Sequence, residues 1–438
     1  MSALPGDIDA EAGPPMTIPL RHFVVALGFL VAGVAIGALD GRAGHLAQVH
    51  LLLAGWVCLT ILGAMTQFVP VWAGVELHSR RLAAVQLPLA AVGFAGLAAG
   101  LLGRVDGLLP VAGGLALAGV WLFCYNLART LRDASLDVTT GLFAVALGFF
   151  ALVTLAGLGL ALDRTVGVLP VAGVTRATLL TAHATLAVFG AVLTTVLGAL
   201  AQLVPMFTQA DTGRVAALAE RVVAVGYPVG VLLLAGGRLF AAPAVARVGG
   251  LLVAAGLATV GLVLARRLVG ATVDWSPMLT RYAVVAVSLL GWAPLGALAW
   301  VRDPLGYAGL FGHPAAGTLL LVGVVGFVVF GTLYHVVPFI VWVHRYSDRL
   351  GFEVVPMIDD LYDGRVAAAD ATALVAAGGL ALAHGADLLP AVAATAAGAL
   401  AFGGAALFGA NLLSVLVSHG PQSMPELLAG RLARAWDR

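Results

Sequence analysis

The stretch GAMTQFVPVW, from Gly63 to Trp72, occurs in three related copies along this chain. It returns as GALAQLVPMF from Gly198 to Phe207 and as GTLYHVVPFI from Gly331 to Ile340. The prolines of the three copies are 135 and 133 residues apart, so the spacing is nearly regular. Self-similarity at a regular period indicates an internal repeat, which has to be recognised before the fold can be predicted.

The composition around these copies is that of a membrane protein. The chain has 438 residues, of which 61% are hydrophobic and only 10% are charged, and its mean hydropathy is +1.03. A soluble domain would carry about 25% charged residues. Apolar runs long enough to cross a hydrocarbon core of about 30 Å as helices recur along the chain. They predict twelve transmembrane helices, at residues 19–39, 46–73, 82–103, 107–128, 138–162, 177–207, 216–236, 243–265, 283–301, 310–343, 366–384 and 389–417.

The three copies fall on the second, sixth and tenth of these spans. We therefore expect an all-α integral membrane protein in which twelve transmembrane helices form three pseudo-repeats of four helices. The whole chain, 1–438, would be a single membrane domain, with repeat units at approximately 19–130, 138–267 and 279–417. Membrane folds built from repeats place their binding sites where the repeats meet.

Each copy also carries glycines and a proline at matching positions. Two glycines precede each proline by 15 and 7 residues, which places them on nearly one face of a helix. They are Gly55, Gly63, Gly190, Gly198, Gly323 and Gly331. Small residues allow either a neighbouring helix or a flat cofactor to approach the backbone closely. The prolines, Pro70, Pro205 and Pro338, are expected to end or kink each helix near the cytoplasmic surface.

The distribution of arginine predicts the orientation. The chain has no lysine, and 16 of its 23 basic residues lie on the side of the N-terminus if the spans lie where we expect them. Positive residues concentrate on the cytoplasmic side, so both termini are expected there, in a multi-pass protein of a prokaryotic-type cytoplasmic (inner) membrane. Residues 1–15 are acidic and rich in proline, without the basic segment of a signal peptide, and are expected to be a disordered tail. Cys58 and Cys124 fall inside spans and are expected to pack as small side chains.

Four histidines lie toward the outer ends of the repeat-related spans. His45 and His50 precede the proline of the second span by 25 and 20 residues. His183 precedes that of the sixth by 22, and His313 that of the tenth by 25. Polar side chains in the membrane are costly and are functional by default, and neutral imidazole is a common ligand of metals and of haem iron. A packed, hydrogen-bonded histidine explains one such residue more easily than four, so we expect at least two of them to bind a haem or a metal.

Other polar residues of the spans suggest different roles. His335 lies three residues before its proline, where the other copies have Gln67 and Gln202, and is expected to form helix-end hydrogen bonds. Glu220, at the start of the seventh span, is expected at the membrane interface. We expect no buried carboxylate that could pass protons, so the sequence does not predict a proton pump, and no residue stands out as catalytic.

The helix plan and these motifs resemble subunit I of the haem–copper oxidase superfamily, which includes cytochrome c oxidases and the large subunit of nitric oxide reductases. That family has twelve helices in three pseudo-repeats, with histidines on helices 2, 6 and 10. GTLYHVVP, Gly331 to Pro338, is similar to the Gly-x-Leu-Tyr-x-x-Val-Pro of helix 10 in C-type oxidases. QVHLLLAGWV, Gln48 to Val57, is similar to the beginning of that helix but lies on helix 2. The resemblance in helix plan covers all twelve spans, whereas the motifs cover only the second, sixth and tenth.

The resemblance implies a haem held between helices 2 and 10. His50 or His45 matches the ligand on helix 2, and His313 is the histidine toward the outer end of helix 10, so the family plan favours His50 with His313. Strict repeat register favours His45 with His313, because both lie 25 residues before the proline. His183 could replace either partner.

The chain departs from the family at the copper site. Residues 216–236 contain no histidine, and Ala316 and Thr318 occupy the positions of the family's His-x-His pair on helix 10. The resemblance therefore implies a divergent member with haem as its cofactor and without the usual haem–copper centre, so copper is not expected.

Two functions stay open at this point. The first is a haem-binding redox protein for electron transfer or O₂- or NO-related chemistry, in the manner of a respiratory-type oxidoreductase, with an electron-donor protein or a quinol as partner. The second is a non-enzymatic membrane protein that retains the fold, such as a transporter, a sensor or a haem- or metal-handling protein. Both imply contact with the lipid bilayer, neither implies nucleic acid, and the sequence does not indicate an oligomeric state.

Overall fold

The computed structural model of the chain describes residues 15–39, 44–210, 213–420 and 422–429. Within them the structure is helical and contains no β-strand, and twelve helices are long and apolar enough to cross a membrane. The expected class, an all-α integral membrane protein with twelve transmembrane helices, is confirmed. The predicted disordered tail lies, apart from its last residue, outside the described residues.

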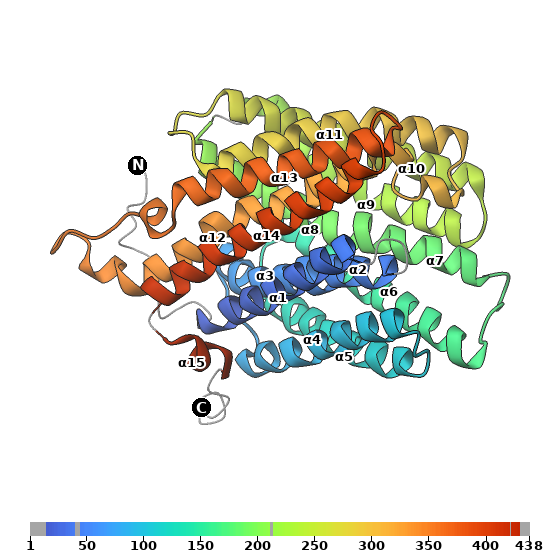
Figure 1. Ribbon diagram of the computed structural model, residues 1–438, viewed down its shortest axis with the longest axis horizontal. Helices are drawn as coiled ribbons and strands as arrows, with labels where there is room; N and C mark the ends of the chain where they lie inside the picture. The colour runs from blue at the N-terminus through green and yellow to red at the C-terminus, as the bar shows by residue number, and fades with distance from the viewer. Residues whose placement is uncertain (1–14, 40–43, 211–212, 421, 430–438) are drawn as a thin grey trace.

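The membrane-spanning helices lie side by side along the long axis of the molecule (Figure 1). In chain order they are α1 (Thr17–Leu39), α2–η2–α3 (His45–Val49, His50–Cys58 and Leu59–Ala73), α4 (Arg80–Gly103), α5 (Leu108–Thr130), α6 (Val138–Val166), α7–η4–α8 (Arg176–Thr185, Leu186–Val192 and Leu193–Thr208), α9 (Gly213–Leu239), α10 (Pro243–Val269), α11 (Pro277–Arg302), η7–α12 (Leu319–Gly326 and Phe327–Arg345), α13 (Gly364–Gly385) and α14 (Val392–His419). Shorter helices lie outside the spans or extend them, namely η3 (Leu131–Asp133), η5 (Tyr307–Gly309), η6 (Pro314–Ala316), η8 (Ser347–Arg349), η9 (Ile358–Leu361) and α15 (Met424–Ala429).

The tenth span begins later than the sequence predicts. The prediction is 310–343, whereas the helix long and apolar enough to cross the membrane runs from Leu319 to Arg345. Gly312 has a φ of +93°, which no helical residue adopts, and Pro314 opens the short turn η6 that leads into η7. His313 therefore lies ahead of the span and not within it.

Each span that carries the repeated stretch contains a π-helical segment, namely η2, η4 or η7. Every segment begins 19 or 20 residues before the repeat proline and ends 12 or 13 residues before it. π-Helix is rare, and short π segments inside α-helices are frequent at functional sites. Three such segments at matching positions are what an internal repeat predicts.

These three spans form the centre of the bundle. Between 61% and 78% of their most apolar windows is buried, against 28–50% for the other nine spans. Trp56 of η2 packs on Phe330 of α12 with ring centroids 4.7 Å apart. Phe207 of α8 packs on His335 of α12 at 4.4 Å. The tenth span thus contacts both the second and the sixth.

The remaining spans surround this centre in a closed ring. The third and fourth helices of each group of four pack on each other, as α4 with α5, α9 with α10 and α13 with α14. The fourth helix of a group packs on the first helix of the next, as α5 with α6 and α10 with α11. α14 packs on α1 (Figure 1), and α1 with α4, α6 with α9 and α11 with α13 are also in contact, which closes the ring. The same helix pairing thus recurs in each group of four.

The repeated glycines allow the central spans to approach the first helix of each group. A Cβ atom at Gly55 would lie 2.2 Å from the ring of Phe29 on α1, and one at Gly190 would lie 2.9 Å from the ring of Phe149 on α6. Real Cβ atoms do not make such contacts with rigid rings. Of the two alternatives for these glycines, close helix packing is therefore the one that the contacts support.

The repeated prolines lie inside helices and do not end them. Pro70, Pro205 and Pro338 belong to α3, α8 and α12, which continue for three, three and seven residues beyond the proline. Helix-ending was one of the two expectations for these residues, and it is wrong for all three.

Candidate functional site

Three of the four candidate histidines line one cavity. The cavity has a volume of about 270 Å³ and lies among the second to sixth spans, with the loop ahead of the tenth span forming part of its wall. His45 and His50 of the second span and His183 of the sixth line it, and His313 does not. The structure therefore brings candidates from spans 2 and 6 together, and not those from spans 2 and 10.

His50 is the first residue of the π segment η2. Its Nδ1 lies 2.7 Å from the carbonyl oxygen of Leu46, one turn earlier in the same span. A carbonyl oxygen only accepts, so Nδ1 must carry the proton and donate it, and Nε2 keeps its lone pair. The described part of the chain provides no hydrogen-bond partner for this Nε2 atom.

His183 is oriented by a neighbouring helix. Its Nδ1 donates to the carbonyl oxygen of Val153 on α6 at 3.0 Å. Gly157, one turn further along α6, also lines the cavity, and a Cβ atom there would lie 3.0 Å from Cε1 of the imidazole. The absence of a side chain at Gly157 thus makes room for the ring, and the Nε2 lone pair of His183 is again unused among the described residues.

The two imidazoles face a common space. His50 and His183 both line the same cavity. An imidazole that donates through Nδ1 to a carbonyl and keeps a lone pair on Nε2 has the tautomer and the orientation of a metal-bound histidine. His50 and His183 both have this arrangement, and each obtains it from a backbone carbonyl.

Two arginines, each paired with a carboxylate, lie at one end of the cavity, and the rest of its wall is mostly apolar. Arg164, at the end of α6, and Arg176, at the start of α7, line that end. Nε of Arg164 lies 2.8 Å from Oδ1 of Asp106, and Nη1 of Arg176 lies 2.8 Å from Oδ2 of Asp163. Aliphatic and aromatic side chains, among them Phe150, form the deeper walls. Such a cavity suits a flat apolar molecule that has acidic groups along one edge.

The other two candidate histidines differ from this pair. His45, the first residue of α2, is exposed and lines the cavity near its surface. His313 precedes the turn η6, and its Nδ1 accepts a hydrogen bond from the backbone N–H of Ala315 at 3.2 Å. His313 therefore caps that turn. Its Nδ1 carries no proton, whereas Nδ1 of His50 and of His183 is protonated, so His313 has the opposite tautomer.

A search of the described ranges finds no group of three or more His, Cys, Asp or Glu side chains placed to hold a metal ion. A haem iron takes four of its ligands from the porphyrin, so one or two imidazoles are sufficient for it. The pair formed by His50 and His183 meets that smaller requirement.

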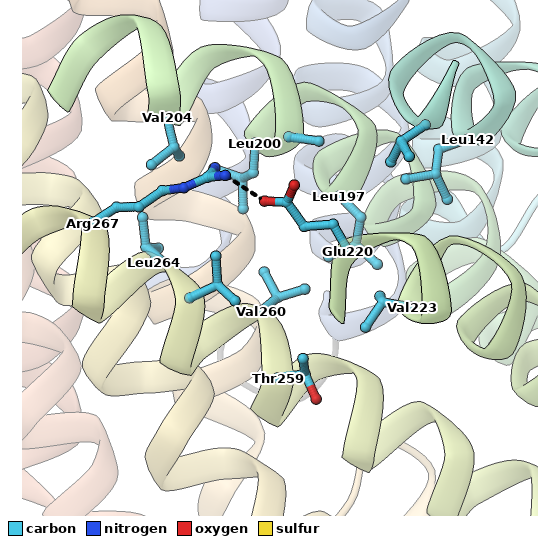
Figure 2. Close-up of a pocket in the computed structure, with 13 residues that line it drawn as sticks. Leu142, Leu197, Leu200, Val204, Glu220, Val223, Thr259, Val260, Leu264 and Arg267 are labelled. Atoms are coloured by element: carbon cyan, nitrogen blue, oxygen red, sulfur yellow. Dashed lines mark ion pairs between the residues drawn. The ribbon is translucent and has the colours of Figure 1, made fainter. Parts of the chain in front are cut away.

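A second, smaller cavity lies among α6, α8, α9 and α10 (Figure 2). Its volume is about 40 Å³, enough for a water molecule but not for an organic ligand. Figure 2 shows Glu220 and Arg267 pointing toward each other across it, and Nη2 of Arg267 lies 2.7 Å from Oε1 of Glu220. Glu220, which we expect at the interface, is thus partly buried and paired with an arginine of α10.

One buried carboxylate that we did not single out lies within the spans. Asp370 of α13 is fully buried and pairs with Arg281 of α11, and the hydroxyl of Tyr334 on α12 donates to its other oxygen. Nδ2 of Asn411 on α14 donates to the Tyr334 hydroxyl at 3.0 Å. The four side chains join four helices. The sequence contains one signal for this cluster. Asp370 is an acidic residue inside an apolar run, and a charge within a membrane span needs a partner.

No protein-family model matches this chain, and no curated protein matches it in sequence.

Proposed function

We propose that this chain is an integral membrane haem protein in which His50 and His183 bind one haem iron as axial ligands, and that it serves in electron transfer. One observation carries the proposal. The two imidazoles line the same cavity, each donates Nδ1–H to a backbone carbonyl, and each keeps its Nε2 lone pair for a ligand.

The rest of the cavity suits the same group. Its apolar and aromatic walls match a porphyrin face, and Arg164 and Arg176 are suitable partners for two propionate groups. A haem held by two imidazoles exchanges one electron at its iron and has no open coordination position for O₂ or NO. His50 and His183 would hold and orient the group, while Gly157 leaves room for one of the two rings.

This pairing differs from the one that the family resemblance implies. The resemblance places the ligands on spans 2 and 10, whereas the proposed pair comes from spans 2 and 6. We retain the relationship to the haem–copper oxidase superfamily as a proposal, supported by the helix plan and the repeated stretch, and we propose no copper centre. The proposal includes the threefold repeat of four helices, because the same helix pairings recur in each group.

We propose the type of membrane and the orientation of the chain in it from the arginine distribution. The excess of arginine on one side supports a prokaryotic-type cytoplasmic membrane with both termini in the cytoplasm. The histidines and the end of the cavity that Arg164 and Arg176 line would then lie toward the outer surface. An electron-donor protein or a quinol remains the proposed redox partner.

Absorption spectroscopy of the purified protein tests the proposal. The full chain is expressed with haem supplied, purified in detergent, and measured in the oxidised and dithionite-reduced forms. Wild type and His313→Ala are expected to show sharp reduced bands of a low-spin haem. His50→Ala and His183→Ala are expected to lose them, and added imidazole is expected to restore them by occupying the vacated space.

Two results would contradict the proposal in different ways. A colourless wild-type protein would exclude haem and favour a non-enzymatic membrane protein that retains the fold. Loss of the low-spin bands in His313→Ala, together with their retention in His183→Ala, would favour the pair that the family plan implies.

A further inference from the structure

Arg238, near the end of α9, is an arginine buried inside the bundle, with only 2% of its surface exposed. Its guanidinium forms four hydrogen bonds. Nε donates to the carbonyl oxygen of Pro304 at 3.0 Å, and Nη2 donates to that of Gly309 at 3.2 Å. Nη1 donates to Oγ1 of Thr185 at 2.7 Å and to the carbonyl oxygen of Leu310 at 3.0 Å. All the acceptors are neutral oxygen atoms.

The positive charge of Arg238 has no carboxylate in contact with it among the described residues. Buried charges in proteins are usually paired with an opposite charge, and an arginine stays protonated even when it is buried. Asp303 precedes Pro304, whose carbonyl accepts from Arg238, but its carboxylate is exposed and accepts hydrogen bonds from the backbone N–H groups of Leu305 and Gly306. Solvent screens that charge, so the charge of Arg238 is only partly balanced.

This charge lies directly behind the wall of the cavity that His50 and His183 line. Thr185, which accepts from Nη1, follows the ligand candidate His183 by two residues on α7. Leu310, which accepts from the same nitrogen, is itself a wall residue. Arg238 does not line the cavity and would not touch a bound group, so it can act on that group only through its charge and through the wall that it holds.

We infer that Arg238 raises the reduction potential of the haem proposed between His50 and His183, an inference that depends on the proposed function. Oxidation of a haem with two neutral axial imidazoles adds one positive charge to it. A fixed positive charge nearby disfavours that state, and in a buried setting of low dielectric constant the effect is much larger than in water. Arg238 therefore favours the reduced haem and sets how readily it accepts an electron.

A redox titration of the purified protein in detergent, followed by the reduced haem bands, tests this inference. Arg238→Gln keeps hydrogen-bond donors but removes the charge, and its midpoint potential is expected to lie below that of wild type with an unchanged absorption spectrum. Arg238→Lys retains the charge and is expected to stay closer to wild type. Arg247→Gln is the matched control, because Nε of Arg247 also donates to a backbone carbonyl, that of Val301 at 2.9 Å, but at an exposed site. Its midpoint is expected not to move.

A second variant covers the case in which Arg238→Gln does not take up haem. Thr185→Asp leaves Arg238 in place and puts a carboxylate against its guanidinium, so its midpoint is also expected to fall. A haem-loaded Arg238→Gln or Thr185→Asp protein with a midpoint at or above the wild-type value would overturn the inference. A coloured wild type with unshifted variants contradicts this inference alone, whereas a colourless wild type contradicts the proposed function and this inference with it.

Discussion

The imidazole of His183 occupies space that Gly157 leaves free, because a Cβ atom on Gly157 would lie 3.0 Å from Cε1 of the ring. The same helix, α6, orients that ring through the carbonyl oxygen of Val153, which accepts from Nδ1 at 3.0 Å. One turn of α6 thus supplies both the hydrogen bond that selects the tautomer and the room that the ring requires.

Replacing Gly157 by alanine is expected to weaken haem binding about tenfold, the usual effect of disturbing a residue that orients a metal ligand. The added methyl group would push the ring of His183 away from its position. The haem-to-protein ratio after titration with haem measures the effect. Gly148→Ala is the control on the same helix, since a Cβ atom there meets nothing within 4 Å. Equal haem binding by both variants would argue against His183 as a ligand.

Carbon monoxide is expected to distinguish a six-coordinate haem from a five-coordinate one. The reduced wild-type protein should not bind it, because two imidazoles fill both axial positions. In His50→Ala or His183→Ala, any haem that is retained has an open position, so carbon monoxide should shift its main absorption band. A shift in the wild type of the same size as in the variants would show that one of the two histidines is not a ligand.

Asp370→Ala is expected to destabilise the protein by about 3–5 kcal/mol, because it leaves Arg281 buried without its counter-charge. The midpoint of thermal unfolding in detergent measures this loss. The double variant Asp370→Leu with Arg281→Met removes both charges and is expected to recover much of the lost stability. A double variant less stable than Asp370→Ala would mean that the ion pair itself stabilises the bundle, and that the unpaired charge of Arg281 is not the cause of the loss.

Gly55→Ala is expected to cost about 1–3 kcal/mol, the usual range for overpacking a filled interior. The new methyl group would lie 2.2 Å from the ring of Phe29, which fills the contact between η2 and α1. Thermal unfolding provides the readout, with Gly28→Ala as control, because Gly28 precedes Phe29 and a Cβ atom there has nothing within 4 Å. Similar unfolding midpoints for the two variants would contradict the packing role of the repeated glycine.

The twelve spans follow from hydropathy because each is a long apolar run with few charges, and such a run has only one stable structure in a membrane. The start of the tenth span is harder to place, because Leu310, Phe311, Ala315 and Ala316 extend the apolar run ahead of the helix. Gly312, with a φ of +93°, interrupts the helical backbone there, and Pro314 begins the turn η6.

The choice of partner for His50 could not be read from spacing. Register relative to the repeat proline aligns His45 with His313 and leaves His183 offset. That comparison assumes that all these histidines lie within helices, whereas His313 follows Gly312, whose φ is +93°, and precedes the first helical turn of its span. The partner of Asp370 could not be read from the sequence either, because Arg281 lies 89 residues away in the chain and on another helix.

The π segments also give each of the three central helices a turn that tolerates a change in length. A π turn holds one residue more than an α turn, so a helix can absorb the insertion of a single residue there while the turns on both sides keep their contacts. In the sixth span, η4 lines the cavity that His50 and His183 share, as far as Val192, and Phe207 further along the span packs on His335 in the centre of the bundle. Such an insertion would let related helices place different residues in their cavities while the three helices continue to pack together.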